Sequence, residues 1–299
     1  EVEGAFRLSK VGVGLISTVR EIVGGIVTLP GGILADVFRK YWGLILALCM
    51  GGFGVGWLVI GQSPTFLPRV TSDNDGYFTV AFFVLLVGVG IVAVAASMWH
   101  LPAMASLSHH YSHRRGTALS FHGIGGNIGD AISPIVTGFL LGYLAWKEIL
   151  SIYAVVPILL AFLVYWAFKN IGRTMPDGAH SEENESEEVG RLDVTKTILR
   201  NPLLWGITFV GSIRAMAFVA LITFLPSYLS NDVGLSDLQR GIYFGLLVAV
   251  GIVFTPLMGY LSDRYGRRLI LVPGMIFDGL IVFLMAPYGD GIALVILIA

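Results

Sequence analysis

The sequence predicts an all-α polytopic membrane protein built from two similar halves. Hydrophobic residues make up 55% of the 299 residues and charged residues only 13%, whereas soluble domains carry about 25% charged residues. The hydrophobic residues form runs of about 20 residues or more, without the strict alternation of barrel strands. A short polar motif also occurs twice, each time between two such runs, which indicates an internal repeat.

Eight of these runs are long enough to cross a bilayer as helices. The predicted helices span residues 11–35, 43–62, 77–105, 117–143, 148–168, 202–229, 237–262 and 269–287. A ninth helix is expected to begin near Gly291. Because the chain does not start with Met and ends inside a hydrophobic run, we expect truncation at both ends.

The repeated motif has a readable physical role. Residues 259–268 read Gly-Tyr-Leu-Ser-Asp-Arg-Tyr-Gly-Arg-Arg, and the copy that starts at Gly32 reads Gly-Ile-Leu-Ala-Asp-Val-Phe-Arg-Lys. Arginine is costly in hydrocarbon, so each turn is held at a membrane face, and the aspartate is stabilised near the positive end of the next helix. One copy alone is explained by a topological anchor, whereas two copies at matching places favour gating loops. Their candidate residues are Gly32, Asp36, Arg39, Lys40, Gly259, Asp263, Arg264, Gly266, Arg267 and Arg268.

Basic residues are distributed unequally between alternate loops. One set of loops holds Arg39, Lys40, Arg114, Arg115, Lys169, Arg173, Arg191, Lys196, Arg200, Arg264, Arg267 and Arg268. The other set holds Arg7, Lys10, Arg69, Lys147 and Arg240. The richer set is expected in the cytoplasm. The long acidic segment at 169–201 is then a cytoplasmic linker between an N-terminal half (1–168) and the start of a C-terminal half (202–299).

Ionisable residues inside the predicted helices are the candidate site, because such residues are costly in a membrane and usually functional. Adjacent helical residues do not face each other, so Arg20 and Glu21 are each expected to need a partner elsewhere. We predict that Arg20 and Arg214 point into one central cavity, with Asp130 within reach of one of them. Structural ion pairs between helices are the alternative. The full candidate set is Arg20, Glu21, His100, His122, Asn127, Asp130 and Arg214.

Histidine relays protons near neutral pH, although a lone helical histidine more often only hydrogen-bonds a neighbour.

The sequence gives no support to disulfide, metal, enzymatic or nucleic-acid-binding functions. Cys49 is the only cysteine, so no disulfide forms within the chain and no Cys/His metal cluster is expected. The sequence has no phosphate-binding loop and no nucleophile–base constellation, so we expect neither an enzyme nor a cofactor. A net charge of −1 gives no reason to expect nucleic acid.

The motif residues resemble the major facilitator superfamily. Residues 259–268 match its signature loop, Gly-x-Leu-Ala/Ser-Asp-Arg-x-Gly-Arg-Arg, at every position. The first copy keeps Gly32 and Asp36 but departs in its basic half, where Val37 replaces the first arginine and Arg39 replaces the second glycine. The segment 121–127 is faintly similar to fosmidomycin-resistance-type exporters.

The resemblance implies twelve helices in two six-helix halves, of which this chain would carry the second to ninth and part of the tenth. It also implies a multi-pass plasma- or inner-membrane transporter that works by alternating access. We therefore expect secondary transport of a small, anionic solute coupled to protons, by symport or antiport, in a monomer. Glu21 and Asp130 are the candidate proton carriers, and Arg20 and Arg214 the candidate substrate ligands. A transporter-like sensor or scaffold without sustained flux is the alternative.

Overall fold

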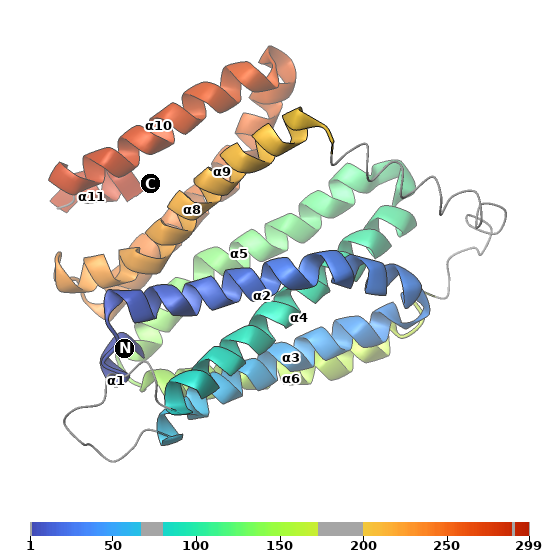
Figure 1. The fold of residues 1–299 in the computed structure, drawn as a ribbon, viewed down its shortest axis with the longest axis horizontal. Coiled ribbons are helices and arrows are strands. Elements are labelled where there is room, and N and C mark those ends of the chain that lie inside the picture. The colour runs from blue at the N-terminus through green and yellow to red at the C-terminus, as the bar shows by residue number, and fades with distance from the viewer. Residues whose placement is uncertain (1, 67–79, 173–199, 289–290, 299) are drawn as a thin grey trace. The chain divides into compact units, whose positions relative to one another are not determined.

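The structure is a computed structural model that describes residues 2–66, 80–172, 200–288 and 291–298. Its helices are α1 (Val2–Ala5), α2 (Lys10–Val37), α3 (Trp42–Gln62), α4 (Val80–His110), α5 (Arg115–Leu141), α6 (Trp146–Phe168), α8 (Pro202–Asn231), α9 (Asp237–Tyr265), α10 (Arg267–Tyr288) and α11 (Gly291–Ile298). Short 3-10 helices are η1 (Arg39–Tyr41), η2 (Ser63–Phe66) and η4 (Ser112–Arg114). The described ranges contain no strand (Figure 1).

The structure confirms the predicted membrane helices. Within the described residues, eight helices are long and apolar enough to cross a bilayer, and the expected ninth helix begins at Gly291 as α11. The ends differ by a few residues. For example, α4 continues past the predicted end at residue 105 to His110, because polar residues extend a membrane helix into the aqueous surface without a change of backbone.

Side-chain and backbone chemistry define both ends of α9. At its start, Ser236 forms a capping box, in which the Gln239 backbone N–H donates to the Ser236 hydroxyl at 3.4 Å and the Ser236 backbone N–H donates to Gln239 Oε1 at 2.9 Å. At its end, Gly266 has φ 95°, a conformation that favours glycine. The second glycine of the repeated motif is therefore the residue that ends α9 and allows α10 to begin.

The chain forms two compact units, each described by itself. The first unit holds residues 1–109 and 153–224. In it, α3 packs against α4 through glycines: a Cβ added at Gly56 would lie 3.0 Å from the carbonyl oxygen of Gly88. On its other side α3 runs beside α6 (Figure 1), and a Cβ added at Gly54 would lie 2.7 Å from the carbonyl oxygen of Ala154. Small residues allow this close approach of membrane helices.

The second unit holds residues 110–152 and 225–299. Its most extensive described helix pair is α5 with α9. Glycines again lie in the contact: a Cβ added at Gly245 would lie 2.7 Å from the carbonyl oxygen of Ala131, and Gly138 and Gly241 face the backbone of Asp237 and Pro134. This contact is called the α5–α9 seam below. A separate apolar core consists of Leu225, Leu229, Leu294 and Ile298.

Each compact unit contains residues from both sides of the linker. The division into functional halves at 1–168 and 202–299 stays a prediction, because it concerns how the protein moves rather than how its helices cluster. Most of the predicted linker, residues 173–199, lies outside the described residues.

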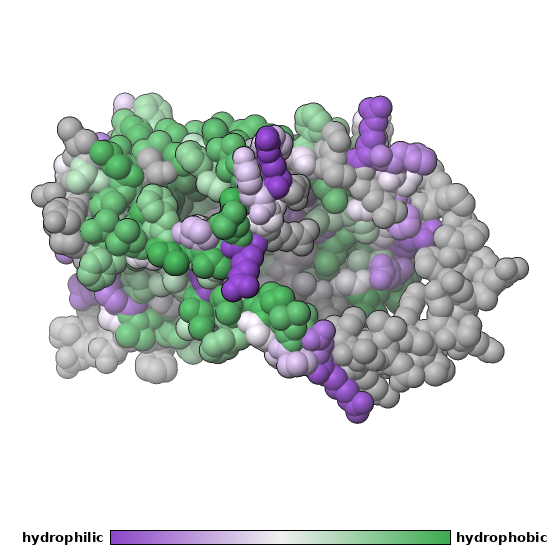
Figure 2. All heavy atoms as spheres, turned by 90° about the horizontal axis from the view of Figure 1, so that it is seen from above, coloured by the Kyte–Doolittle hydropathy of each residue, from purple (hydrophilic) through white to green (hydrophobic). Residues whose placement is uncertain are grey.

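Apolar side chains dominate the outside of the described helices. Phe162, Phe209 and Phe283 are 73%, 67% and 71% exposed, and none of the most apolar stretch of α8 is buried. Many of the residues on the face drawn in Figure 2 are hydrophobic. Such a surface suits acyl chains, which contact apolar side chains at no cost, and agrees with an integral membrane protein.

The α5–α9 seam yields a first prediction, which concerns stability. Gly241→Ala adds a methyl group that meets the carbonyl of Pro134, and overpacking of this kind costs about 1–3 kcal/mol. We expect a lower midpoint of thermal unfolding in detergent. Gly251→Ala on the same helix is the control, because a Cβ there has nothing within 4 Å. Equal midpoints for the two variants would contradict the packing described here.

Candidate functional site

Arg20 and Glu21 lie near the middle of α2, and their side chains are 64% and 52% exposed. Arg20 Nε is 3.8 Å from Glu21 Oε1, so the expectation that these neighbours do not face each other is wrong. Their Cα atoms are about 100° apart around the helix, but both side chains are long enough to curve along its surface and meet. The distance is too long for a hydrogen bond, so the pair is a loose ion pair.

Arg214 lies near the middle of α8 and is exposed. Among the described residues of the first unit, no acidic side chain forms an ion pair with it. Placing an arginine at the middle of a membrane helix raises the free energy of membrane insertion by about 2.5–3.5 kcal/mol.

In the first unit, α2 and α8 contact each other at Ser17 and Thr223. The hydroxyl groups of Ser17 and Thr223 are hydrogen-bonded, with their oxygens 2.9 Å apart. Arg20 follows Ser17 by one helical turn. The sequence offered little signal for this contact, because serine and threonine are common in membrane helices and their partners depend on tertiary packing.

The second unit holds the other candidate acid. Asp130, on α5, is exposed, and Asn127 lies three residues earlier on the same face, half-buried. Asp130 and the arginines belong to different units, so the predicted approach of Asp130 to an arginine stays a prediction. His122, eight residues before Asp130 on α5, is half-buried, whereas His100 on α4 in the first unit is exposed. The structure describes an interaction for each histidine, and the hydrogen-bonding and proton-relay roles both stay predictions.

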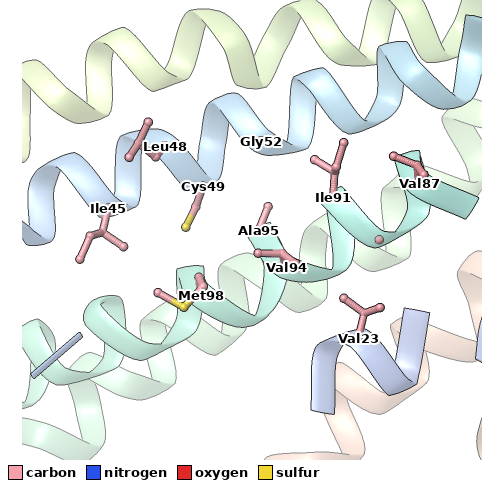
Figure 3. Close-up of a pocket in the computed structure, with 11 residues that line it drawn as sticks. Val23, Ile45, Leu48, Cys49, Gly52, Val87, Ile91, Val94, Ala95 and Met98 are labelled. Carbon is pink, nitrogen blue, oxygen red and sulfur yellow. The ribbon is translucent and has the colours of Figure 1, made fainter. Parts of the chain in front are cut away.

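A cavity of about 590 Å³ lies between α3 and α4 in the first unit, with Val23 of α2 at its border (Figure 3). Cys49, Ala95 and Met98 line it together with other apolar residues (Figure 3). No candidate site residue lines this cavity. Because it offers an anion no polar partner, it is not the predicted central site.

Both copies of the motif occupy a turn between two membrane helices. In the first, the Trp42 indole N–H donates to the Ala35 carbonyl at 2.7 Å, which ties the start of α3 to the end of α2 beside the exposed Asp36. Gly32 lies within α2, and η1 carries Arg39 and Lys40.

In the second copy, Arg264 Nη1 donates to the Tyr260 hydroxyl at 3.0 Å, and its guanidinium carbon lies 5.6 Å from the centre of the Tyr265 ring. The described side chains do not include those of Gly259, Asp263 and Arg267. Arg268 is exposed near the start of α10. The two turns share their helix–turn–helix build, as the repeat predicts.

Metal-ligating side chains do not gather in the described parts of the chain: they hold no group of three or more His, Cys, Asp or Glu that could bind an ion. The polar groups of the candidate site are arginines, carboxylates, histidines and an amide within membrane helices.

Comparison with known proteins finds relatives of this chain among bacterial transporters. It is 22% identical over 275 residues to the nitrite extrusion protein of Bacillus subtilis, covering 92% of this chain and 61% of that protein. It is 25% identical over 291 residues to the glycerol-3-phosphate transporter of Bacillus subtilis, covering 85% of this chain and 65% of that protein. The chain thus spans less than two thirds of the length of these relatives.

A solved structure shares the fold. A crystal structure of a D-xylose-proton symporter matches with a TM-score of 0.57 and 18% identity, covering 96% of this chain and 67% of that one. The family model described as Major Facilitator Superfamily matches residues 2–299. The helical fold, the repeated turn motif and this match agree, and the chain belongs to the Major Facilitator Superfamily.

Proposed function

We propose that the protein is a secondary transporter that moves a small anion across the membrane by alternating access, coupled to protons. The observation that carries this proposal is the placement of Arg20 and Arg214. Each lies near the middle of a membrane helix, and the two helices contact each other through Ser17 and Thr223.

The positions of the arginines along the helices support a shared ligand. Arg20 is three residues from Ser17, or about 4.5 Å along α2, and Arg214 is nine residues from Thr223, or about 13.5 Å along α8. The two α-carbons then differ by about 9 Å in height, since both lie on the same side of the hydroxyl contact. Arg20 lies about 60° around α2 from Ser17, whereas Arg214 lies about 180° around α8 from Thr223. A shared small anion therefore requires the long Arg214 side chain to curve around α8, and each guanidinium can then donate two hydrogen bonds to it.

The relatives support the same class of substrate. The names of two of them, a nitrite extrusion protein and a glycerol-3-phosphate transporter, both refer to small anions. A planar guanidinium presents paired N–H donors that match two oxygens of one oxyanion. We therefore propose an oxyanion as the substrate.

The contact between Arg20 and Glu21 suggests how protons are coupled to the anion. While Glu21 is ionised it competes for the Arg20 guanidinium 3.8 Å away. Protonation removes the negative charge and leaves Arg20 free for the substrate. Anion and proton then bind together, which is the requirement for symport.

Replacing these acids tests the coupling. Glu21→Gln or Asp130→Asn should reduce accumulation driven by a pH gradient more strongly than it reduces exchange of labelled anion at equal pH, because the amide mimics the protonated acid permanently. Both rates are measured in vesicles containing the protein. Accumulation that follows the pH gradient unchanged in both variants would show that neither acid carries the coupled proton.

The proposed orientation puts residues 169–201 in the cytoplasm of the cell, at the plasma or inner membrane, because their side of the bilayer collects most of the loop arginines and lysines.

Ligand-induced stabilisation tests the substrate class independently of transport. Nitrite, nitrate or glycerol-3-phosphate should raise the unfolding midpoint of the purified protein, with a saturating dependence on concentration, whereas D-xylose should not. A shift from D-xylose alone would redirect the proposal to neutral sugars.

A further inference from the structure

Within the first unit, α2 packs against α4 through two glycines of α2. A Cβ added at Gly24 would lie 3.1 Å from the Ser97 hydroxyl oxygen, and a Cβ added at Gly31 would lie 2.6 Å from Met98 Sδ. The two glycines are seven residues apart, so they lie about two turns apart on one face of α2. Because neither glycine has a side chain, α4 approaches the backbone of α2 at both places.

A hydrogen bond joins the two helices at the first of these glycines. The Ser97 hydroxyl donates to the Gly24 carbonyl at 3.2 Å, and the hydroxyl of Thr28, on α2 itself, donates to the same carbonyl at 2.8 Å. Of these two bonds, only the one from Ser97 joins two helices. The Gly24 carbonyl keeps a side-chain donor without Ser97, so what the Ser97 bond adds is a connection between α2 and α4.

This connection lies where the backbone hydrogen bonds of α2 are interrupted by Pro30. Proline has no N–H, so no helical bond reaches the carbonyl of Ile26 four residues earlier, and helices bend readily at such a place. The helix α4 contacts α2 on both sides of Pro30, at Gly24 before it and at Gly31 after it. The packing of α4 therefore fixes the direction of the first part of α2 relative to its last part.

The first part of α2 carries the ion pair of Arg20 and Glu21 next to this connection. On a helix with 3.6 residues per turn, Gly24 lies one turn after the pair and between its two members in direction, about 40° from Arg20 and about 60° from Glu21. The last part of α2 carries Gly32 and Asp36 of the repeated motif. The hydrogen bond to α4 thus sets the direction in which the ion pair points within the first unit.

We propose that Ser97 is a positioning residue of the anion site, which holds the turn of α2 that carries Arg20 and Glu21 in the orientation that binds the anion. This inference rests on the proposed function and adds to it a residue that contacts neither the anion nor the proton. Without the bond, the part of α2 before Pro30 samples more orientations. The apparent dissociation constant then rises by the factor by which the binding orientation loses population, and one hydrogen bond between membrane helices changes such a population about threefold.

Removing each hydroxyl donor in turn tests this role. Ser97→Ala removes the bond between the helices, whereas Thr28→Val removes the bond within α2 and is the matched control. We expect Ser97→Ala to raise the dissociation constant of labelled nitrite or glycerol-3-phosphate for the purified protein about three- to tenfold, and Thr28→Val to leave it unchanged. An equal loss in both variants would overturn the positioning role.

A double-mutant cycle distinguishes positioning from a general loss of stability. The ammonium of Arg20→Lys binds as a point charge, so the orientation of α2 matters less to it. Ser97→Ala should then have little further effect on the dissociation constant in the Arg20→Lys protein, but should lower the unfolding midpoint equally in both backgrounds. The same further rise in the dissociation constant in both backgrounds would overturn the proposal.

A distance measurement makes the test independent of the anion. Cys49 is the only cysteine, so in a Cys49→Ala parent nitroxide labels attach only at Ile22→Cys beside the ion pair and at Phe83→Cys on α4, both at exposed positions. Double electron–electron resonance should give a broader distance distribution after Ser97→Ala than in the parent. An unchanged distribution would overturn the positioning role whatever the substrate. If the parent binds no oxyanion and the distribution still broadens, the proposed function fails while Ser97 keeps its role in orienting this turn of α2.

Discussion

Replacing Arg214 by lysine is expected to weaken anion binding about ten- to a hundredfold, although the charge is kept. Lysine is a point charge on a flexible stem and cannot donate two parallel hydrogen bonds to an oxyanion as a guanidinium does. The loss of one hydrogen bond to a charged group costs about 1.5–3 kcal/mol, and Arg214 has no described ion pair in its unit that would offset it. The dissociation constant is measured by equilibrium binding of labelled anion to purified protein.

Arg20→Lys should show the same loss with an added effect. A lysine ammonium is more strongly hydrated than a guanidinium and reaches Glu21 with different geometry, so the pH dependence of anion binding should change along with its strength. Arg240→Lys is the control, because Arg240 is paired with Asp237 at the start of α9. Binding that is unchanged in both site variants would remove the basis of the anion site.

Asp263→Asn is expected to leave the protein folded and to slow transport about tenfold or more. The substitution keeps the size of the side chain and removes the charge that the proposed gating role requires, and one hydrogen bond to a charged group is typically worth about 1.5–3 kcal/mol. Initial rates of uptake in vesicles, normalised to protein amount, measure the effect. The unfolding midpoint provides the control for folding.

The matching change in the first copy, Asp36→Asn, should act in the same direction but less strongly. Its motif lacks the first arginine, which Val37 replaces, and Asp36 is exposed. A wild-type rate for the Asp263 variant would show that the second turn is only a topological anchor.

Local chemistry is what the sequence predicts well. Long hydrophobic runs define α2 to α10 because a membrane helix satisfies its own backbone and needs no partner to be recognised. Gly266 shows the same for turns. The turn between α9 and α10 requires a positive φ, and the motif has a glycine at this position for that reason. The ends of α4 and α9 shift by a few residues because water-exposed turns tolerate several endpoints.

Contacts between helices are harder to predict. Glycine accounts for 38 of the 299 residues, and nothing local distinguishes Gly241, which faces Pro134, from Gly251, which faces open space. The Ser17–Thr223 contact was missed for the same reason. The Arg20–Glu21 contact was misjudged because helical geometry fixes where Cβ atoms point but leaves long side chains free to curve.

Counterflow in vesicles tests the central claim most directly. Vesicles containing the protein are loaded with unlabelled nitrite or glycerol-3-phosphate and diluted into a trace of the labelled anion at equal pH. We expect transient accumulation of label above its equilibrium level, which is lost with Arg214→Lys. Label that enters no faster than into empty vesicles, for every oxyanion tested, would contradict the assignment of an anion transporter.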